Sequence, residues 1–263
     1  MDKTNIQKTL YIPLYGKAFV TQKGLFLSDK AAEEIWSGLK LTLKGKAKSK
    51  WLAYYMGIRA AVFDEWTRTQ LTDNPNAVVL HLGCGLDSRA LRVQAKGQLW
   101  YDVDFPEVIA QRKRHYEEFD GYTMLGADIN EGEWLDEIAN ADIAIVVMEG
   151  VSMYLSLEQL QTLFTRLGKK FQTVALLMDS YSVFAAKMSK IKNPVKEVGV
   201  TQVYGLDDFT QLERGGFVCT EALEMTPAKY VNELQGGERK IFEKLYAGGF
   251  SKKLYRLHAF EKK

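Results

Sequence analysis

The sequence predicts an α/β fold in which about seven strands form one sheet with helices on both faces. From about residue 77 onward, strongly apolar runs alternate with amphipathic stretches, which is typical of a parallel sheet wrapped by helices. A glycine-rich turn, Gly83-Cys84-Gly85, follows the first of these runs. Strand, turn, helix and second strand therefore form one unit between Val78 and Asp104, and such units bind ligands at the carboxyl ends of their strands.

The apolar runs give the order of the expected strands. Five of them precede residue 180, at 77–82, 98–103, 122–125, 143–148 and 173–178. Two more lie near the end of the chain, at 217–224 and 253–260, on either side of a helical stretch at 232–245. Amphipathic helices are expected at 106–119 and 157–170, where apolar residues recur at helical spacing.

The first 75 residues lack this alternation. Two segments there, 30–43 and 51–69, carry apolar residues at helical spacing, so we expect helices in both. Residues 1–75 are expected to form a helical lid over the ligand-binding edge of a core at 76–263. The stretch 182–205, which follows the fifth strand, is expected to be an insertion that forms a second part of the lid.

The composition fits a single domain with additions. The chain has 263 residues, of which 46% are hydrophobic, so it can bury a large core. Its formal charge is +2 and its acids and bases are well mixed, so we expect no nucleic-acid partner. The lysine-rich run at 44–50 is the exception, either as a solvated loop or as a surface that attracts an acidic substrate.

Several other classes of protein are disfavoured. Cys84 and Cys219 form neither a metal-ligand pair nor a disulfide framework, so we expect no metal and a reducing compartment. The longest strongly apolar run, 143–148, is far shorter than the roughly 18 residues of a membrane span. The N-terminus lacks the apolar stretch of a secretion signal. We therefore expect a cytoplasmic protein with no membrane partner.

The turn itself favours S-adenosylmethionine (SAM) over a dinucleotide. A dinucleotide fingerprint has a third glycine near the start of the helix, where this chain has Ser88 and Arg89. Asp87 in the loop would repel a pyrophosphate, whereas its carboxylate can accept a hydrogen bond from the ammonium group of a methionine moiety. The alternative is a plain α/β turn in which Gly83 and Gly85 serve geometry alone.

Two acids end the second expected strand. Asp104 lies nineteen residues after Gly85, which is the separation expected for an acid that binds a ribose. Asp102 shares its face of the sheet, because residues two apart in a strand point the same way. We expect Asp104 to bind the ribose and Asp102 to orient a nearby basic side chain.

Two further acids follow later strands. Asp128 comes after the third strand, where it either accepts a hydrogen bond from an adenine amino group or serves the local structure. Glu149 directly follows the apolar fourth strand, and a carboxylate there needs a partner because burying it unpaired is costly. We expect Glu149 to contact the cofactor, with capping of the next helix as the alternative.

Five features, in this order and spacing, resemble the leucine carboxyl methyltransferase family and its bacterial tetracenomycin-type polyketide O-methyltransferase relatives. They are VVLHLGCGLDSRALRV, WYDVDFPEVI with Arg112 after it, Asp128, MEGVSMYLSLEQL and LLMDSYS. The resemblance covers most of the chain. It implies a class I SAM-dependent methyltransferase fold, which is Rossmann-like, with a helical lid and a last strand that is commonly antiparallel.

The resemblance also implies roles for single residues. In the family, a lysine near the N-terminus and an arginine before the first strand hold the carboxylate of the cofactor, and Lys17 and Arg59 fall at these places. Gly83 would line the methionine portion and Asp104 the ribose. The remaining implied contacts are those of Asp128 and Ile129 with the adenine and of Glu149 with the sulfonium side.

The methyl acceptor is less constrained by the sequence. Lys30 stands where a proline is usual in the family, and 182–205 matches it weakly. A carboxylate acceptor is ionised near pH 7, whereas a phenol, with a pKa near 10, would benefit from a base. Because His81, His115 and His258 are assigned no catalytic role, we expect O-methylation of a carboxylate or a phenolic oxygen of a small molecule. Four tyrosines are candidates to orient it, with core packing as the alternative: Tyr15, Tyr154, Tyr181 and Tyr204.

Two rival functions remain open at this stage. A dinucleotide-dependent oxidoreductase is disfavoured by the missing third glycine and by the acid in the loop. A non-catalytic nucleoside-binding protein would need the same turn and the same ribose-binding acid. Binding of SAM and its product S-adenosylhomocysteine (SAH), compared with NADH and NADPH, separates these three functions.

Overall fold

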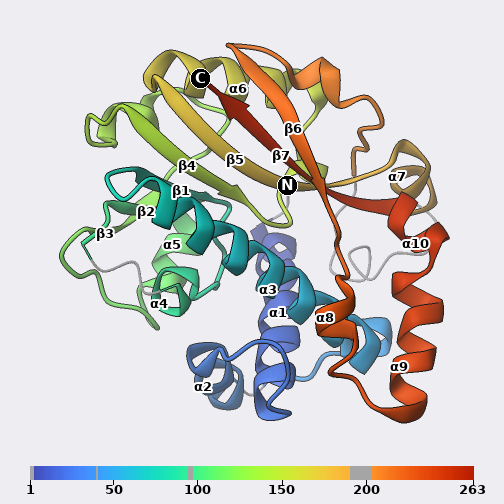
Figure 1. The fold of residues 1–263 in the computed structure, drawn as a ribbon. Helices are drawn as coiled ribbons and strands as arrows, with labels where there is room; N and C mark the ends of the chain where they lie inside the picture. Colours follow the sequence, from blue (N-terminus) through green and yellow to red (C-terminus); the bar gives the residue numbers. More distant parts are fainter. Residues whose placement is uncertain (1–2, 40, 94–96, 190–202) are drawn as a thin grey trace.

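The computed structural model describes residues 3–39, 41–93, 97–189 and 203–263, and its described residues contain one seven-stranded sheet (Figure 1). The order across the sheet is β3-β2-β1-β4-β5-β7-β6. All paired strands are parallel except β7, which is antiparallel to both of its neighbours. The strands are β1 Val78–Leu82, β2 Trp100–Asp104, β3 Tyr122–Gly126, β4 Ile143–Met148, β5 Thr173–Tyr181, β6 Phe217–Leu223 and β7 Tyr255–Lys262. The expected sheet and its antiparallel last strand are confirmed.

Helices cover both faces of this sheet and continue beyond its edge. Those before β4 are α1 Lys3–Gln22, α2 Lys30–Gly38, α3 Lys50–Asp73, α4 Arg89–Arg92 and α5 Pro106–Arg112. Those after β4 are α6 Leu157–Lys170, α7 Val183–Ser189, α8 Ala228–Val231, α9 Gly236–Phe242 and α10 Gly249–Leu254, with the π-helical turn Glu243–Ala247 joining the last two.

The expected helices differ from the observed ones mainly in length. The helix expected at 157–170 has the bounds of α6, which begins with a capping box formed by Ser156 and Gln159. The one expected at 30–43 stops at Gly38, after which Leu39 has extended backbone. Glycine is a poor helix former, which explains this early end.

The sheet creates a crevice where its strand order reverses. β1 lies in the middle, paired with β2 on one side and with β4 on the other. All five residues of β1 are buried, as expected for a parallel strand covered on both faces. The loops after β1 and β4 therefore leave the sheet side by side, and ligands of open α/β sheets bind at such a switch point.

The N-terminal and C-terminal helices pack against each other on one side of the sheet (Figure 1). Glu238 of α9 accepts hydrogen bonds from Lys50 and Tyr54 of α3, both at 2.7 Å. Lys229 of α8 pairs with Glu65, also of α3, at 2.5 Å. The helices at 1–75, expected to be a lid, thus have partners between residues 228 and 254 that the sequence did not reveal.

The stretch expected to be a second part of the lid, 182–205, is described only at its two ends. They are α7 and the residues from 203 onward, whereas residues 190–202 of the expected second lid segment lie outside the described residues. Among the helices that the structure does describe, none is both long enough and apolar enough to span a membrane.

Asp102 joins three strands beneath the crevice. Its carboxylate accepts hydrogen bonds from Trp100 Nε1 at 2.8 Å and Tyr122 Oη at 2.7 Å, and its Oδ1 lies 3.1 Å from His81 Nδ1. It also pairs with the buried guanidinium of Arg112. Burial alone would raise the pKa of Asp102, but Arg112 and these hydrogen bonds hold it at about 2. Asp102 therefore orients a basic side chain, as expected.

We predict that Asp102→Asn lowers the free energy of unfolding by about 3–5 kcal/mol, because the buried guanidinium of Arg112 loses its counter-charge. Urea denaturation followed by circular dichroism measures this. The exposed Asp120→Asn is the control and should change stability by no more than about 0.5 kcal/mol. A loss for Asp102→Asn as small as that of the control would show that the ion pair does not stabilise the fold.

Candidate active site

A cavity of about 750 Å³ lies at the carboxyl edge of the sheet, between the loops after β1 to β4, helices α1 and α3, and the C-terminal helices. Its size falls within the roughly 300–1,000 Å³ of small-molecule sites. All the residues predicted to bind the cofactor line it: Lys17, Arg59, Gly83, Gly85, Asp87, Asp104, Asp128, Ile129 and Glu149. The folded chain thus brings together residues that are up to 132 positions apart.

The turn after β1 passes close to the turn after β4. Gly83 and Gly85 have φ of +67° and +54°, a region that side chains disfavour. A Cβ at Gly83 would also collide with the side chain of Val151. Gly83 therefore meets two requirements, a left-handed backbone and a close approach of two loops.

Asp104 is held against this turn. It accepts hydrogen bonds from the backbone N–H groups of Gly85 and Phe105, both at 2.8 Å. Burial raises the pKa of Asp104 to about 6, although these hydrogen bonds lower it. Asp128, farther along the same edge, accepts hydrogen bonds from the backbone and side-chain N–H groups of Asn130, at 2.9 and 2.8 Å.

Lys17 of α1 reaches the loop acid. Its Nζ lies 2.5 Å from Asp87 Oδ2, and both side chains are almost fully buried. Asp87 also accepts hydrogen bonds from Arg92 at 2.6 Å and Arg89 at 3.3 Å. Burial would raise the pKa of Asp87, but the surrounding cations lower it well below its usual value. The first helix is thereby tied to the glycine turn.

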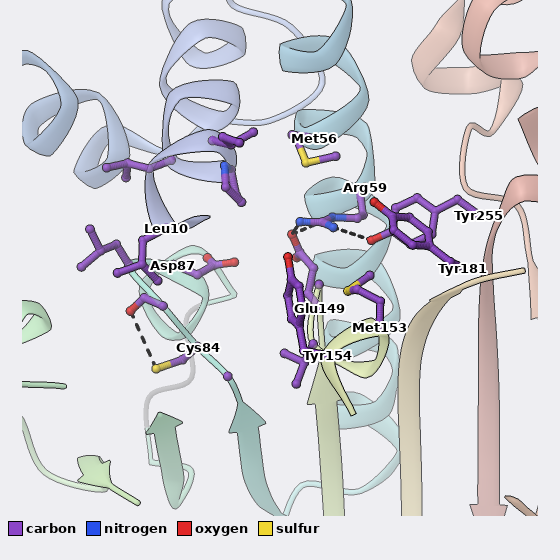
Figure 2. A pocket seen from close by; sticks show the side chains of 18 of the residues that line it. Leu10, Met56, Arg59, Cys84, Asp87, Glu149, Met153, Tyr154, Tyr181 and Tyr255 are labelled. Carbon is purple, nitrogen blue, oxygen red and sulfur yellow. Dashed lines mark hydrogen bonds and ion pairs between the residues drawn. The ribbon is translucent and has the colours of Figure 1, made fainter. Parts of the chain in front are cut away.

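Arg59 of α3 lies between the ends of β4 and β5, as Figure 2 shows. Its Nε lies 3.1 Å from Glu149 Oε1, and its Nη1 donates to Asp179 at 3.1 Å and to Tyr255 Oη at 2.6 Å. The other oxygen of Glu149 pairs with Arg89. Burial would raise the pKa of Glu149, but the cations around it, Arg59 foremost, hold it at about 2, so this carboxylate is ionised.

These contacts belong to one buried network. Asp64 of α3 pairs with Arg89 at 2.9 Å and with Arg92 at 2.7 Å, and Asp29 pairs with Arg92 at 2.6 Å. The buried members are four cations and five carboxylates, and the half-exposed Arg68 pairs with Asp64 at the rim of the network at 4.0 Å. Those buried members are Lys17, Arg59, Arg89 and Arg92 with Asp29, Asp64, Asp87, Glu149 and Asp179. This arrangement lines the cavity with both cationic and anionic side chains.

Sequence reasoning missed five members of this network, together with Tyr255, which accepts a hydrogen bond from Arg59. The five are Asp29, Asp64, Arg89, Arg92 and Asp179. A local signal existed for Arg89 and Arg92, because residues three apart in a helix share one face. Asp64 gave another local signal, because it is a charged residue that follows a run of apolar residues in α3. Nothing local marks Tyr255, because its partner Arg59 lies 196 residues away in the chain.

The other end of the cavity is lined by tyrosines. Among the candidate residues for the acceptor, Tyr154 and Tyr181 line it, whereas Tyr15 and Tyr204 are not among the lining residues. Tyr15 packs on Trp36 with ring centroids 5.0 Å apart. The structure adds Tyr55, Tyr246 and Tyr255 to this end, with ring centroids 5.1 Å apart for Tyr55 and Tyr246 and 4.8 Å for Tyr181 and Tyr255.

The three histidines stand apart from this end of the cavity. His81 is buried beside Asp102, and burial lowers its pKa. His258 stacks on Phe209 with ring centroids 3.4 Å apart, and burial lowers its pKa to about 4. Of the three, only His81 is among the lining residues, and it lies beneath the turn after β1.

Comparisons with known proteins agree with this geometry. Residues 3–168 match the model of the leucine carboxyl methyltransferase family. The tetracenomycin polyketide synthesis O-methyltransferase TcmP of Streptomyces glaucescens is 32% identical over 212 residues, which cover 80% of this chain and 78% of TcmP. The S-adenosyl-L-methionine-dependent methyltransferase dpfgK of Gibberella zeae is 26% identical over 234 residues, with 80% and 78% covered.

The fold is also shared with solved methyltransferase structures. Magnesium protoporphyrin IX methyltransferase (ChlM) from Synechocystis, with bound SAH, has a TM-score of 0.52 at 12% identity, covering 89% of this chain and 93% of that one. This likeness concerns the fold alone. The match to the family model over more than half of the chain and the identity to TcmP show that this chain belongs to the leucine carboxyl methyltransferase family of SAM-dependent methyltransferases.

Proposed function

We propose that this protein transfers the methyl group of SAM to a carboxylate oxygen or, failing that, a phenolic oxygen of a small molecule. One observation carries the proposal: a single cavity holds both the charged residues expected for the cofactor and a tyrosine-lined end next to them. When bound, SAM supplies a methyl group on positively charged sulfur, which an acceptor oxygen displaces in line. Holding that oxygen in place supplies much of the rate.

The charged residues fit the parts of the cofactor one by one. We assign the carboxylate to Lys17 and Arg59, and the ammonium group to Asp87. Asp104 would accept hydrogen bonds from the ribose, and the glycines at 83 and 85 let the backbone approach it. The adenine would lie by Asp128 and Ile129, and Glu149 by the sulfonium.

The mixture of charges in the network supports this assignment. SAM carries one carboxylate and two positive groups, and the cavity offers it both cationic and anionic side chains. Glu149 remains ionised because Arg59, Lys17 and Arg89 hold its pKa at about 2. A carboxylate in this state favours a neighbouring sulfonium over a neutral sulfur.

The tyrosines support an acceptor that arrives ionised. Burial raises the pKa of Tyr154 and of Tyr181, so both hydroxyls stay protonated near neutral pH. They can donate hydrogen bonds to an acceptor oxygen, but they do not take its proton. A carboxylate needs no base, and it needs no metal to become nucleophilic. We therefore propose a reaction without a metal cofactor.

We also propose that residues 1–75 act as the lid and 76–263 as the core, with α7 as the described part of the second lid segment at 182–205. Lys17 and Arg59 support this division, because they reach the cavity from the lid helices. Covering the cavity would exclude water from the transferred methyl group. We propose that the acceptor is a free small molecule in the cytoplasm. A nucleic acid is disfavoured because acids and bases are well mixed over the chain.

We predict that SAH stabilises the protein by about 2.7 kcal/mol at a hundredfold excess over its dissociation constant, because it binds only the native state. Denaturant unfolding with and without SAH measures this, and NADH at the same concentration should have no effect. Stabilisation by NADH but not by SAH would contradict the proposed cofactor.

Asp104→Asn should weaken SAH binding by about 1.5–3 kcal/mol, the scale of hydrogen bonds to a charged group. Only the ionised carboxylate accepts from both ribose hydroxyls. Because the pKa of Asp104 is about 6, the affinity of the parent protein should fall as the pH drops below 6. Titration calorimetry between pH 5 and 8 tests both expectations, and the variant should lack this pH dependence. A folded variant with unchanged affinity would reassign Asp104 to structure.

The acceptor class predicts a property of the product. Incubation with labelled SAM and a panel of carboxylic acids and phenols should give a methylated product, and brief alkaline treatment should release the label as methanol. A methyl ester hydrolyses under these conditions, whereas a phenol ether or an N-methyl group survives. An alkali-stable phenol ether would select the second acceptor class, and an N-methyl product would overturn O-methylation.

A further inference from the structure

The hydrogen-bonding capacity of Arg59 is almost fully used within the protein. A guanidinium has five N–H groups, two on each Nη and one on Nε. In the described part of the chain, Nε contacts Glu149, and Nη1 contacts both Asp179 and Tyr255. Nη2 lies 3.0 Å from the same Glu149 oxygen. Only Nη2 therefore keeps a donor for a ligand, so Arg59 can offer a carboxylate a single hydrogen bond.

The two partners of Nη1 also hold each other. Tyr255 Oη donates to Asp179 Oδ2 at 2.5 Å while it accepts from Arg59. Asp179 Oδ1 accepts from the backbone N–H of Gly150 at 2.7 Å. A Cβ at Gly150 would lie 3.2 Å from Nη1, so its backbone packs closely on the guanidinium. The plane of Arg59 is thus fixed from three sides.

The ring of Tyr255 is fixed as well. It packs against Tyr181 with ring centroids 4.8 Å apart and against Tyr55 at 6.0 Å. The register of β5 and β7 pairs Tyr181 directly with Tyr255, which brings both rings to the cavity. Tyr255 is 7% exposed, so its hydroxyl has little access to water as a substitute partner. Figure 2 shows Tyr255 beside Arg59, on the side away from Glu149.

We propose that Tyr255, together with Asp179, is a positioning residue that aims the free N–H of Arg59 at the carboxylate end of the cofactor. This inference rests on the proposed function. Without the hydroxyl, one Nη1 donor would be buried unpaired, and the guanidinium would gain by turning to another acceptor. Its Nη2 would then no longer point at the cofactor carboxylate, while contacts with the ribose and the adenine would be unaffected.

The test compares two ligands that differ only in the carboxylate, SAH and decarboxylated SAH. Titration calorimetry gives the ratio of their dissociation constants for the parent protein and for Tyr255→Phe, which keeps the ring. The preference for SAH should fall by about threefold to tenfold, the effect of one hydrogen bond, while binding of decarboxylated SAH stays within twofold. Tyr246→Phe removes a hydroxyl from a ring that packs on Tyr55, and among the described residues the hydrogen-bond partners of Arg59 are Glu149, Asp179 and Tyr255, so this variant should keep the ratio of the parent protein.

A purely structural role for Tyr255 gives a different result. Both ligands would then weaken equally, or neither would change, and either outcome overturns the proposal. In an Arg59→Lys background, Tyr255→Phe should have no further effect on the ratio, and a persisting effect would also overturn it. If Tyr255→Phe does not fold, Asp179→Asn should show the same loss of preference, and an unchanged ratio would overturn the proposal.

The same titrations distinguish failure of this inference from failure of the proposed function. A parent protein that binds neither ligand contradicts the SAM site itself. A parent protein that prefers SAH, with a Tyr255→Phe variant that prefers it equally, contradicts only the positioning role.

Discussion

The buried ion pairs between the N-terminal helices and the sheet are the constraint on which this structure depends. A carboxylate or guanidinium removed from water is costly unless it is paired. Glu149, at the end of β4, lies between Arg59 of α3 and Arg89 of α4, so moving either helix would leave a buried charge without a partner. Because Lys17 and Asp87 make the same kind of contact, α1 is bound to the glycine turn as well. The cavity owes its charged wall to these pairs.

Local patterns in the sequence predicted the parts of the fold that local physics decides. The alternation of apolar and amphipathic segments located all seven strands to within three residues at either end. The spacing of nineteen residues predicted that Asp104 binds a ribose, and the structure places its carboxylate at the cavity, where it accepts a hydrogen bond from Gly85 N at 2.8 Å. The turn after the first strand also lies where Gly83 and Gly85 predicted it, and both glycines have a left-handed backbone in the structure. These features depend on neighbours in sequence or on a single β-loop-α-β unit.

Contacts between distant segments could not be predicted in the same way. Helical spacing places Arg89 and Arg92 on one face, but only the passage of α3 over the strand ends makes them buried partners of Asp64. Tyr255 reaches Arg59 because β7 inserts antiparallel beside β5, a register that no pattern near either residue encodes. Tyr15 is a case in which the sequence pattern allowed two outcomes. Its helical spacing is compatible both with a place in the cavity and with core packing, and in the structure its ring packs on Trp36.

The two ends of the cavity differ in how they are built. The proposed cofactor end combines charges that hold one another in place through ion pairs. The proposed acceptor end is made of tyrosines from α3, the turn after β4, β5 and the C-terminal segment, so its shape depends on how these elements pack. This difference explains why the sequence predicts the cofactor more specifically than it predicts the methyl acceptor.

Hydrogen–deuterium exchange with and without SAH tests most directly the central claim that the buried ion pairs make the N-terminal helices part of the cofactor site. Protection should increase in the turn after β1 and, to a similar degree, in α1 around Lys17 and in α3 around Arg59, because the ligand carboxylate joins the same network. Protection confined to the turn and to β2, with α1 and α3 unchanged, would contradict the account.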